Sequence, residues 1–186
     1  MRKTVRATTL LLAVLYLLSV SLPATATGNN PYLRPNKEIV FKEGDHVQLL
    51  ASELTAGKFT TEEKAMAIYS YIVTGFDYDW ELYGQIVSKQ ITHYTPDANS
   101  VLKKQKGICY DIASLYAAMC RNIGIPTKMI KGYARNVRGY HAWNSVYDDT
   151  TDKWVSIDLT TDLCLKKGAA SSWRPMRHEA VARSIV

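Results

Sequence analysis

Cysteine is a strong nucleophile among protein side chains, and this chain of 186 residues contains three cysteines. Cys109 stands two residues after Gly107, at the start of an apolar helical pattern. The free N–H groups and the positive dipole end of a helix N-terminus favour an anion, and the thiolate is the nucleophilic form of cysteine. Cys120 and Cys164 fit better as small apolar residues of a core. Cys109 is therefore the candidate nucleophile, and Gly107 is expected to let the chain turn sharply and leave the sulfur open.

A thiolate nucleophile needs a base that accepts and returns a proton near neutral pH, and histidine is suited to this task. The sequence offers four histidines, His46, His93, His141 and His178. His141 lies near the start of a strand-like run and has aromatic neighbours, Tyr140 and Trp143, that can hold its ring by packing. The other three stand in polar or basic surroundings. His141 is the candidate base.

The base in turn needs an acceptor that orients its second ring nitrogen. Asp158 lies near the end of the strand-like run that follows the one containing His141. Because side chains alternate along a strand, a hairpin that pairs residue 141 with 158 and 147 with 152 would make His141 and Asp158 cross-strand neighbours. The alternative role for Asp158 is that of a residue in a turn at the end of a strand. The candidate triad is Cys109, His141 and Asp158.

The remaining pattern indicates the elements that must position these residues. Thr60 and Glu63 form a capping box ahead of an apolar period that ends near Gly75. Helices are predicted over residues 45–56, 60–75, 97–104 and 109–123. Strands are predicted over Thr127–Ala134, Tyr140–Tyr147 and Lys153–Leu159, and one more helix is expected after Pro175. A helix followed by an antiparallel meander favours an α+β fold over a doubly wound parallel sheet.

Several motifs occur together in one order: Gly107-Ile108-Cys109-Tyr110-Asp111-Ile112-Ala113, Gly124-Ile125-Pro126, Lys131-Gly132-Tyr133, His141-Ala142-Trp143 and Trp154-Val155-Ser156-Ile157-Asp158. In this order and spacing they resemble the transglutaminase-like, papain-related superfamily, in its bacterial exported form. The resemblance implies a nucleophile helix packed on an antiparallel sheet, with Cys109, His141 and Asp158 as the catalytic triad. The sequence departs from the family pattern at Leu159, where a proline often follows the aspartate. That difference changes the turn and leaves the triad intact.

The resemblance also implies a mechanism in which Cys109 attacks a carboxamide or peptide carbonyl and forms a thioester. The backbone N–H of Cys109 is the expected first oxyanion donor, and Tyr78 or Trp80 is the candidate second donor. Substrate-cleft positions are assigned to Tyr83, Tyr110 and Trp143.

The segment from Trp80 to Pro96 is aromatic and polar and has no clear period. It is long for a loop in a compact domain. It is expected to form one wall of the substrate cleft, and the competing interpretation is that its aromatic residues fill the core.

Three activities stay open for such a chain. A cysteine protease or amidase that hydrolyses peptide or amide bonds is favoured. The alternatives are a transglutaminase that transfers an amine to protein glutamine, and an inactive relative that only binds a peptide. No cofactor is expected, and a metal site is disfavoured because Cys109, His141 and Cys164 have no ligand-like spacing.

The first 26 residues have the layout of a secretory signal peptide: a basic start, an apolar run from Leu10 to Leu22 and Ala24-Thr25-Ala26 before the cleavage point. Residues 27–44 are expected to form an arm or linker and residues 45–186 the catalytic domain. A run of 13 apolar residues is short of the ~20 that a spanning helix needs, so no stable membrane span is expected after cleavage. The predicted location is secreted or in the cell envelope.

The formal net charge of the whole chain is +6. The first 26 residues contain three basic and no acidic residues, so the rest of the chain carries +3. This small, scattered charge disfavours nucleic acid, and the expected partner is a peptide or protein substrate, with cell-envelope material as an option. A disulfide between Cys120 and Cys164 would leave Cys109 free and stays open at this point.

Overall fold

The computed structural model describes residues 30–134, 137–165, 174–175 and 181–185. The predicted signal peptide and His178 lie outside the described residues. The helices are η1 (Pro31–Leu33), α2 (His46–Leu54), α3 (Thr61–Gly75), α4 (Trp80–Val87), α5 (Ala98–Lys104), α6 (Cys109–Asn122) and α7 (Leu159–Cys164). The strands are β1 (Asp77–Tyr78), β2 (Lys106–Gly107), β3 (Thr127–Tyr133), β4 (His141–Asp148), β5 (Lys153–Ile157), β6 (Arg174–Pro175) and β7 (Val181–Ile185).

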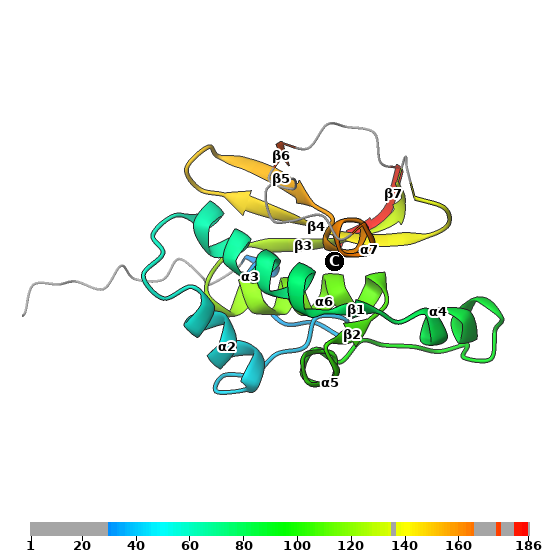
Figure 1. Ribbon diagram of the computed structural model, residues 1–186. Helices are drawn as coiled ribbons and strands as arrows, with labels where there is room; N and C mark the ends of the chain where they lie inside the picture. Colours follow the sequence, from blue (N-terminus) through cyan, green and yellow to red (C-terminus); the bar gives the residue numbers. More distant parts are fainter. Residues whose placement is uncertain (1–29, 135–136, 166–173, 176–180, 186) are drawn as a thin grey trace, which may run out of the picture. The chain divides into compact units, whose positions relative to one another are not determined.

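The fold of residues 31–186 is α+β, as predicted. Five strands form an antiparallel sheet in the order β6-β5-β4-β3-β7, and helices α2, α3, α5 and α6 lie on one side of it (Figure 1). Helix α6 packs against β3 and β4 on one side and against α2, α3 and α5 on the other. The nucleophile helix is thus the centre of the domain.

Helix α6 is buried on every face from Asp111 to Arg121. Its apolar stripe was evident in the sequence, but the small residues between the stripe positions, such as Ala113 and Ala117, are buried as well. A helix covered by a sheet on one side and by helices on the other needs no polar face. Burial of both faces holds its first residue, Cys109, in a fixed position.

The four helices predicted between residues 45 and 123 are confirmed within one or two residues at most ends. The capping box of α3 is present: the Thr60 hydroxyl accepts from the backbone N–H of Glu63 at 3.1 Å, and the Glu63 carboxylate accepts from the backbone N–H of Thr60 at 3.1 Å. Asp45 and Asp97 cap α2 and α5 by one-way hydrogen bonds, in which their carboxylates accept from the backbone N–H groups of Gln48 and Ser100.

The segment expected as an arm or linker packs on the domain from Pro31 onward. Ile39 is fully buried in the hydrophobic core, and the Ser114 hydroxyl of α6 donates to the backbone carbonyl of Glu38. The Glu38 carboxylate also pairs with the Lys131 ammonium of β3 at 2.8 Å. These contacts tie the arm to both α6 and the sheet.

Two predictions at the end of the chain are wrong. The third strand was expected to reach Leu159, but β5 ends at Ile157 and Leu159 begins α7, because Asp158 caps this helix through the backbone N–H of Thr161. A helix was expected after Pro175, but residues 181–185 form strand β7, which pairs with β3.

The hairpin register also differs from the expected one. Tyr147 pairs with Trp154 and Asp148 with Lys153, whereas a pairing of 147 with 152 was expected. The loop has the expected length but begins one residue later, because the Asp148 carboxylate accepts hydrogen bonds from within the turn and Asp152 adopts a left-handed φ of 56°, which aspartate tolerates. The shift moves the partner by two residues, so every side chain keeps its face of the sheet.

Candidate active site

Cys109 is the first residue of α6, as predicted. A short parallel pairing of β1 with β2 precedes it and sets Tyr78 opposite Gly107. Backbone hydrogen bonds from Asp77 to Gln105 and from Asp79 to Gly107, both 3.0 Å, fix this pairing. The pairing brings Tyr78 beside the start of the nucleophile helix.

Gly107 is required by a close approach and not by the sharp turn that its position suggested. A Cβ atom at residue 107 would lie 2.6 Å from the Cβ of Asp111, a distance that real Cβ atoms do not adopt. Asp111 is buried and accepts from the backbone N–H of Ile108 at 3.0 Å and from the Tyr94 hydroxyl at 2.7 Å. The carboxylate therefore clamps the residues that lead into Cys109, and Tyr94 attaches the segment of residues 80–96 to the same point.

His141 and Asp158 form the expected pair. The Nε2 atom of His141 lies 2.9 Å from Oδ2 of Asp158, and the imidazole side chain is 4 % exposed. The hydroxyl of Thr161 donates to the same Oδ2 atom at 2.8 Å, and the backbone N–H of Thr161 donates to Oδ1 at 3.1 Å. The first turn of α7 therefore fixes the Asp158 carboxylate. The fixed carboxylate in turn keeps the His141 ring in one orientation.

The Cys109 thiol lies beside the imidazole, in the same pocket, and interacts with it. Since Nε2 faces Asp158, Nδ1 is the nitrogen left for the thiol. Burial alone would lower the pKa of His141, but the hydrogen bonds and charges of Asp158 and Cys109 outweigh it and raise this pKa from 6.5 to about 9. The imidazole is therefore protonated at neutral pH, and its Nε2–H donates to Asp158.

The pKa of Asp158 is shifted in the opposite direction, downward. Burial would raise its pKa, but the hydrogen bond and charge of His141, together with the two donors of Thr161, lower it below the usual value. Asp158 is therefore ionised over the physiological range and stabilises the imidazolium.

Tyr78 and Trp80 were the candidate second oxyanion donors. The Tyr78 hydroxyl lies beside the backbone N–H of Cys109. Burial raises the pKa of Tyr78, and the nearby thiols Cys109 and Cys164 raise it further, so the hydroxyl keeps its proton. Trp80 packs on the Tyr78 ring with centroids 4.5 Å apart. The oxyanion role of either residue stays a prediction, and Trp80 contacts the site through the Tyr78 ring.

A pocket with a volume of about 430 Å³ surrounds Cys109 and His141. Its other lining residues come from four places: strand β1, helix α4, the connection between β3 and β4, and helix α7 with the residue after it. They are Tyr78, Trp80, Tyr83, Val137, Arg138, Tyr140, Thr160, Thr161, Cys164 and Leu165. Two of the aromatic residues in the segment of residues 80–96, Trp80 and Tyr83, thus lie in the wall beside the thiol. Neither is buried, since Trp80 is 65 % and Tyr83 37 % exposed.

Tyr110 and Trp143 do not line this pocket, contrary to expectation. Trp143 is buried and stacks on the His141 ring with centroids 6.0 Å apart, so it braces the base from the protein side. Tyr110 follows the nucleophile on the helix and points toward the Glu38–Lys131 pair, with the Lys131 ammonium 5.2 Å from its ring centroid. A one-residue step along a helix rotates the side chain by about 100°, which takes Tyr110 away from the pocket.

Helix α7 and its pocket residues were missed by the sequence analysis. The signal was the pair Asp158 and Thr161, which has the three-residue spacing of a helix N-cap. The interpretation of residues up to Leu159 as a strand concealed it. Helix α7 is also attached to α3, since the Tyr69 hydroxyl donates to the Asp162 carboxylate at 2.9 Å.

The three thiols differ in their surroundings. Cys120 is fully buried, and burial raises its pKa to about 12, which agrees with its predicted inert role. Cys164 is exposed and lines the pocket of Cys109. All three cysteines are free, so the Cys120–Cys164 disulfide is wrong. Over the described ranges, no cluster of three or more histidine, cysteine or acidic side chains could hold a metal ion.

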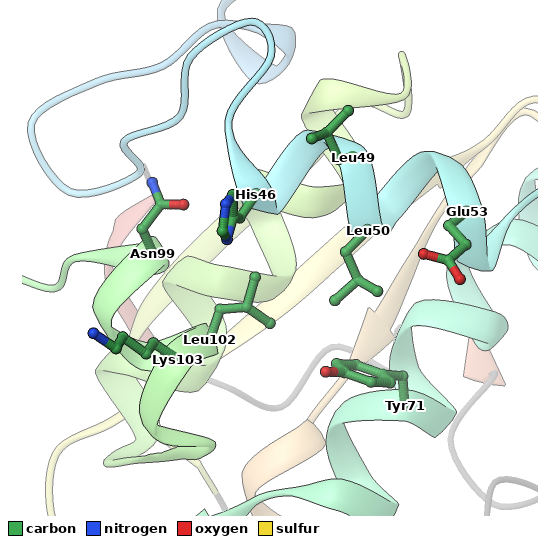
Figure 2. A pocket seen from close by; sticks show the side chains of 8 residues that line it. All are labelled: His46, Leu49, Leu50, Glu53, Tyr71, Asn99, Leu102 and Lys103. Atoms are coloured by element: carbon green, nitrogen blue, oxygen red, sulfur yellow. The ribbon is translucent and has the colours of Figure 1, made fainter.

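A second hollow lies away from these residues, between α2, α3 and α5. Figure 2 shows its lining, which consists of His46, Leu49, Leu50, Glu53, Tyr71, Asn99, Leu102 and Lys103. Its volume is about 820 Å³. His46, which the sequence analysis set aside, lies here and not near Cys109.

A helix-borne cysteine beside a buried histidine that an aspartate orients, on an antiparallel sheet, defines the class of papain-related thiol proteins. Residues 48–159 match the model of the Transglutaminase-like superfamily. The chain therefore belongs to that superfamily. Among the residues that the structure describes, no helix is long and apolar enough to span a membrane.

The individual proteins that this chain resembles have low sequence identity to it. The kyphoscoliosis peptidases of human and mouse are 29 % and 30 % identical over 122 residues, which is 60 % of this chain but only 17 % of each peptidase. A candidate cysteine protease from Cytophaga hutchinsonii has a similar fold, with a TM-score of 0.57 and 21 % identity over 84 % of this chain and 53 % of that one. The periplasmic domain of TgpA from Pseudomonas aeruginosa, bound to ethylmercury, also has a similar fold. Its TM-score is 0.55 and its sequence identity 18 %, over 73 % of this chain and 49 % of that one. The chain thus spans about a sixth of its curated relatives and half of these solved structures.

Proposed function

We propose that the protein is a cysteine-nucleophile enzyme that acts on peptide or amide bonds through a thioester intermediate. The observation that carries this proposal is the placement of Cys109 at the N-terminus of α6, in one pocket with His141, whose ring is oriented by Asp158 at 2.9 Å. A nucleophile, a proton carrier and an orienting carboxylate are the parts that covalent acyl transfer requires.

In the first half of the reaction, the Cys109 thiolate attacks the carbonyl carbon of the substrate. The protonated His141, held by Asp158, then gives its proton to the leaving amine as the C–N bond breaks and the thioester forms. In the second half, His141 takes a proton from water, the resulting hydroxide attacks the thioester, and the acid leaves as the thiolate is restored. The same ring acts once as an acid and once as a base.

Negative charge that develops on the carbonyl oxygen needs donors fixed in advance. The backbone N–H of Cys109 at the helix start is one such donor. The Tyr78 hydroxyl, which lies beside the Cys109 backbone, is the second in this proposal.

Hydrolysis is favoured over transfer to an amine. A transferase must keep water away from the thioester, and the wall of this pocket includes Trp80 and Tyr83, which remain exposed to solvent. The substrate is then a peptide or protein. The alternatives remain a protein-glutamine amine transferase and a peptide-binding module without activity.

We also propose that the chain is exported to the cell envelope or secreted. The support is the signal-peptide layout of residues 1–26. Intact-mass measurement of the protein recovered outside the cytoplasm should show cleavage after Ala26.

The proposed mechanism is tested by selective labelling followed by turnover. Iodoacetamide at pH 6, with mapping of the labelled cysteine, should modify Cys109 much faster than Cys164, although Cys164 is the more exposed thiol. A peptide library incubated with the enzyme should give free acids, and added primary amine should give adducts only if transfer competes. Cys109→Ala should abolish turnover, and Cys120→Ala, which alters a buried thiol away from the pocket, should retain it. Equal labelling of Cys109 and Cys164, or turnover by Cys109→Ala, would show that the mechanism is wrong.

A further inference from the structure

We propose that Arg138 binds a carboxylate of the substrate, so that the pocket selects acidic peptides. This inference rests on the proposed function and adds to it the chemical class of the substrate. It is drawn from the charges that line the pocket, from the lack of a protein partner for Arg138 among the described residues, and from the aromatic wall that stands with it.

Arg138 is the cation that the pocket lining has besides the catalytic groups, and no aspartate or glutamate is among the described residues that line it. The positive charge of His141 is balanced by Asp158 and by the Cys109 thiolate. Asp158 lies behind His141 and has both oxygens engaged, Oδ1 by the backbone N–H of Thr161 and Oδ2 by His141 and the Thr161 hydroxyl. Arg138 is therefore the one cation among the described lining residues whose charge no neighbouring group offsets, and it can attract an anionic substrate group.

Arg138 is available to a ligand. Within the part of the chain that the structure describes, it forms no ion pair and no side-chain hydrogen bond, in contrast to Arg121, whose guanidinium donates to the backbone carbonyl of Thr127 at 2.9 and 2.7 Å. Arg138 is exposed, and the next residue, Gly139, has a φ of 95° that a side chain would not readily adopt. The glycine lets the chain turn so that Arg138 and Tyr140 both face the pocket.

A guanidinium is a specific receptor for a carboxylate, because its parallel N–H groups match the two oxygens of the anion. Carboxylates on a peptide come from aspartate and glutamate side chains and from a free C-terminus. Both offer the same group, and matched substrates tell them apart.

The aromatic wall provides the rest of the recognition. Tyr78, Trp80 and Tyr83 form one cluster, with ring centroids 4.5 to 6.1 Å apart. In Figure 1, α4, which carries Trp80 and Tyr83, lies at the same end of the domain as the connection between β3 and β4 that carries Arg138. Apolar contact from the cluster and charge from Arg138 suit a peptide with an apolar residue and an acidic group on either side of the reacting amide.

A first experiment reads the charge of the pocket without a substrate. The rate of Cys109 alkylation is measured with iodoacetate, which is anionic, and with iodoacetamide, which is neutral and similar in size. Arg138→Gln should lower the ratio of the two rates by about three- to tenfold, because one nearby positive charge is lost, and Arg138→Lys should restore most of it. Lys58→Gln, which removes the same charge from an exposed site outside the described pockets, is the control and should leave the ratio unchanged.

A second experiment uses peptides that differ only in glutamate against glutamine at one position, or in a free against an amidated C-terminus. The wild type should prefer the carboxylate in one of these pairs by about 10- to 100-fold in kcat/KM, as expected for a charged hydrogen bond, mainly through KM. Arg138→Gln should bring that preference close to one.

The outcomes separate this inference from the proposed function. An alkylation ratio that is the same in Arg138→Gln and the wild type would overturn the role of Arg138, whatever the enzyme hydrolyses. If no peptide is turned over but Arg138→Gln still lowers the ratio of the iodoacetate to the iodoacetamide rate as expected, the proposed function is contradicted and the anion site stands. Turnover of neutral peptides without preference for any carboxylate would refute the substrate class.

Discussion

Two hollows of this domain differ in what surrounds them. The groove between α2, α3 and α5 has a volume of about 820 Å³, and the pocket at Cys109 has about 430 Å³. The groove is formed by the flanks of helices, and its lining has leucines with His46, Glu53, Asn99 and Lys103 around them (Figure 2). The pocket is formed where a helix begins, a hairpin strand begins and a second helix is capped.

The comparison shows that size does not identify the site. The groove has a histidine, His46, but no cysteine, serine or threonine beside it among the described residues that line it. At the pocket, the start of α6 offers free N–H groups, and Asp158 uses the N-cap of α7 to hold His141. The pocket therefore differs from the groove in holding an oriented set of groups, and substitutions in the two hollows should differ in their effect on turnover.

The largest effect among these tests is expected for Asp158→Asn. The asparagine keeps the cap of α7 but removes the charge that stabilises the imidazolium, so we expect kcat to fall by up to about 10⁴-fold. The pKa of His141, which is about 9 in the wild type, should move toward its ordinary value, and NMR titration of the ring can follow this change. An unchanged pKa would show that Asp158 does not orient and charge the base.

A smaller effect is expected for Tyr78→Phe. The ring and its packing on Trp80 stay, and only the hydroxyl near the Cys109 backbone is lost. We expect kcat to fall by about 10²- to 10³-fold, the cost of one oxyanion donor, while the rate of Cys109 alkylation changes little. A loss confined to KM would place Tyr78 in substrate binding instead.

The smallest effects come from a matched pair of exposed apolar residues, one in each hollow. Trp80 is 65 % exposed in the pocket and Leu49 is 60 % exposed in the groove. We expect Trp80→Ala to raise KM by about 5- to 30-fold, as truncation of an aromatic contact residue does. Leu49→Ala should change KM by less than about twofold and the free energy of unfolding by less than about 0.5 kcal/mol. A larger effect of Leu49→Ala on KM would mean that the groove takes part in substrate binding.

The sequence by itself determined four helices, α2, α3, α5 and α6, together with the three central strands and the candidate chemistry, but not α4 and α7. Local signals carry this information: the capping box at Thr60 and Glu63, the apolar period after Cys109, and the alternation that puts His141 and Asp158 on one face of a hairpin. The predicted contact formed even though the hairpin register was wrong by two residues, since a shift of two conserves the face of each side chain.

Only the tertiary structure decided which aromatic residues border the site. Trp80 and Tyr83 line the pocket, whereas Tyr110 and Trp143 pack elsewhere, although the sequence offered all four as candidate site residues. The structure also placed Arg138, from a connection without a periodic pattern, beside the nucleophile. These outcomes depend on the pairing of β1 with β2, on the cap of α7 and on the burial of α6, which join residues distant in sequence. A local pattern shows which face a side chain occupies, but only packing determines what that face meets.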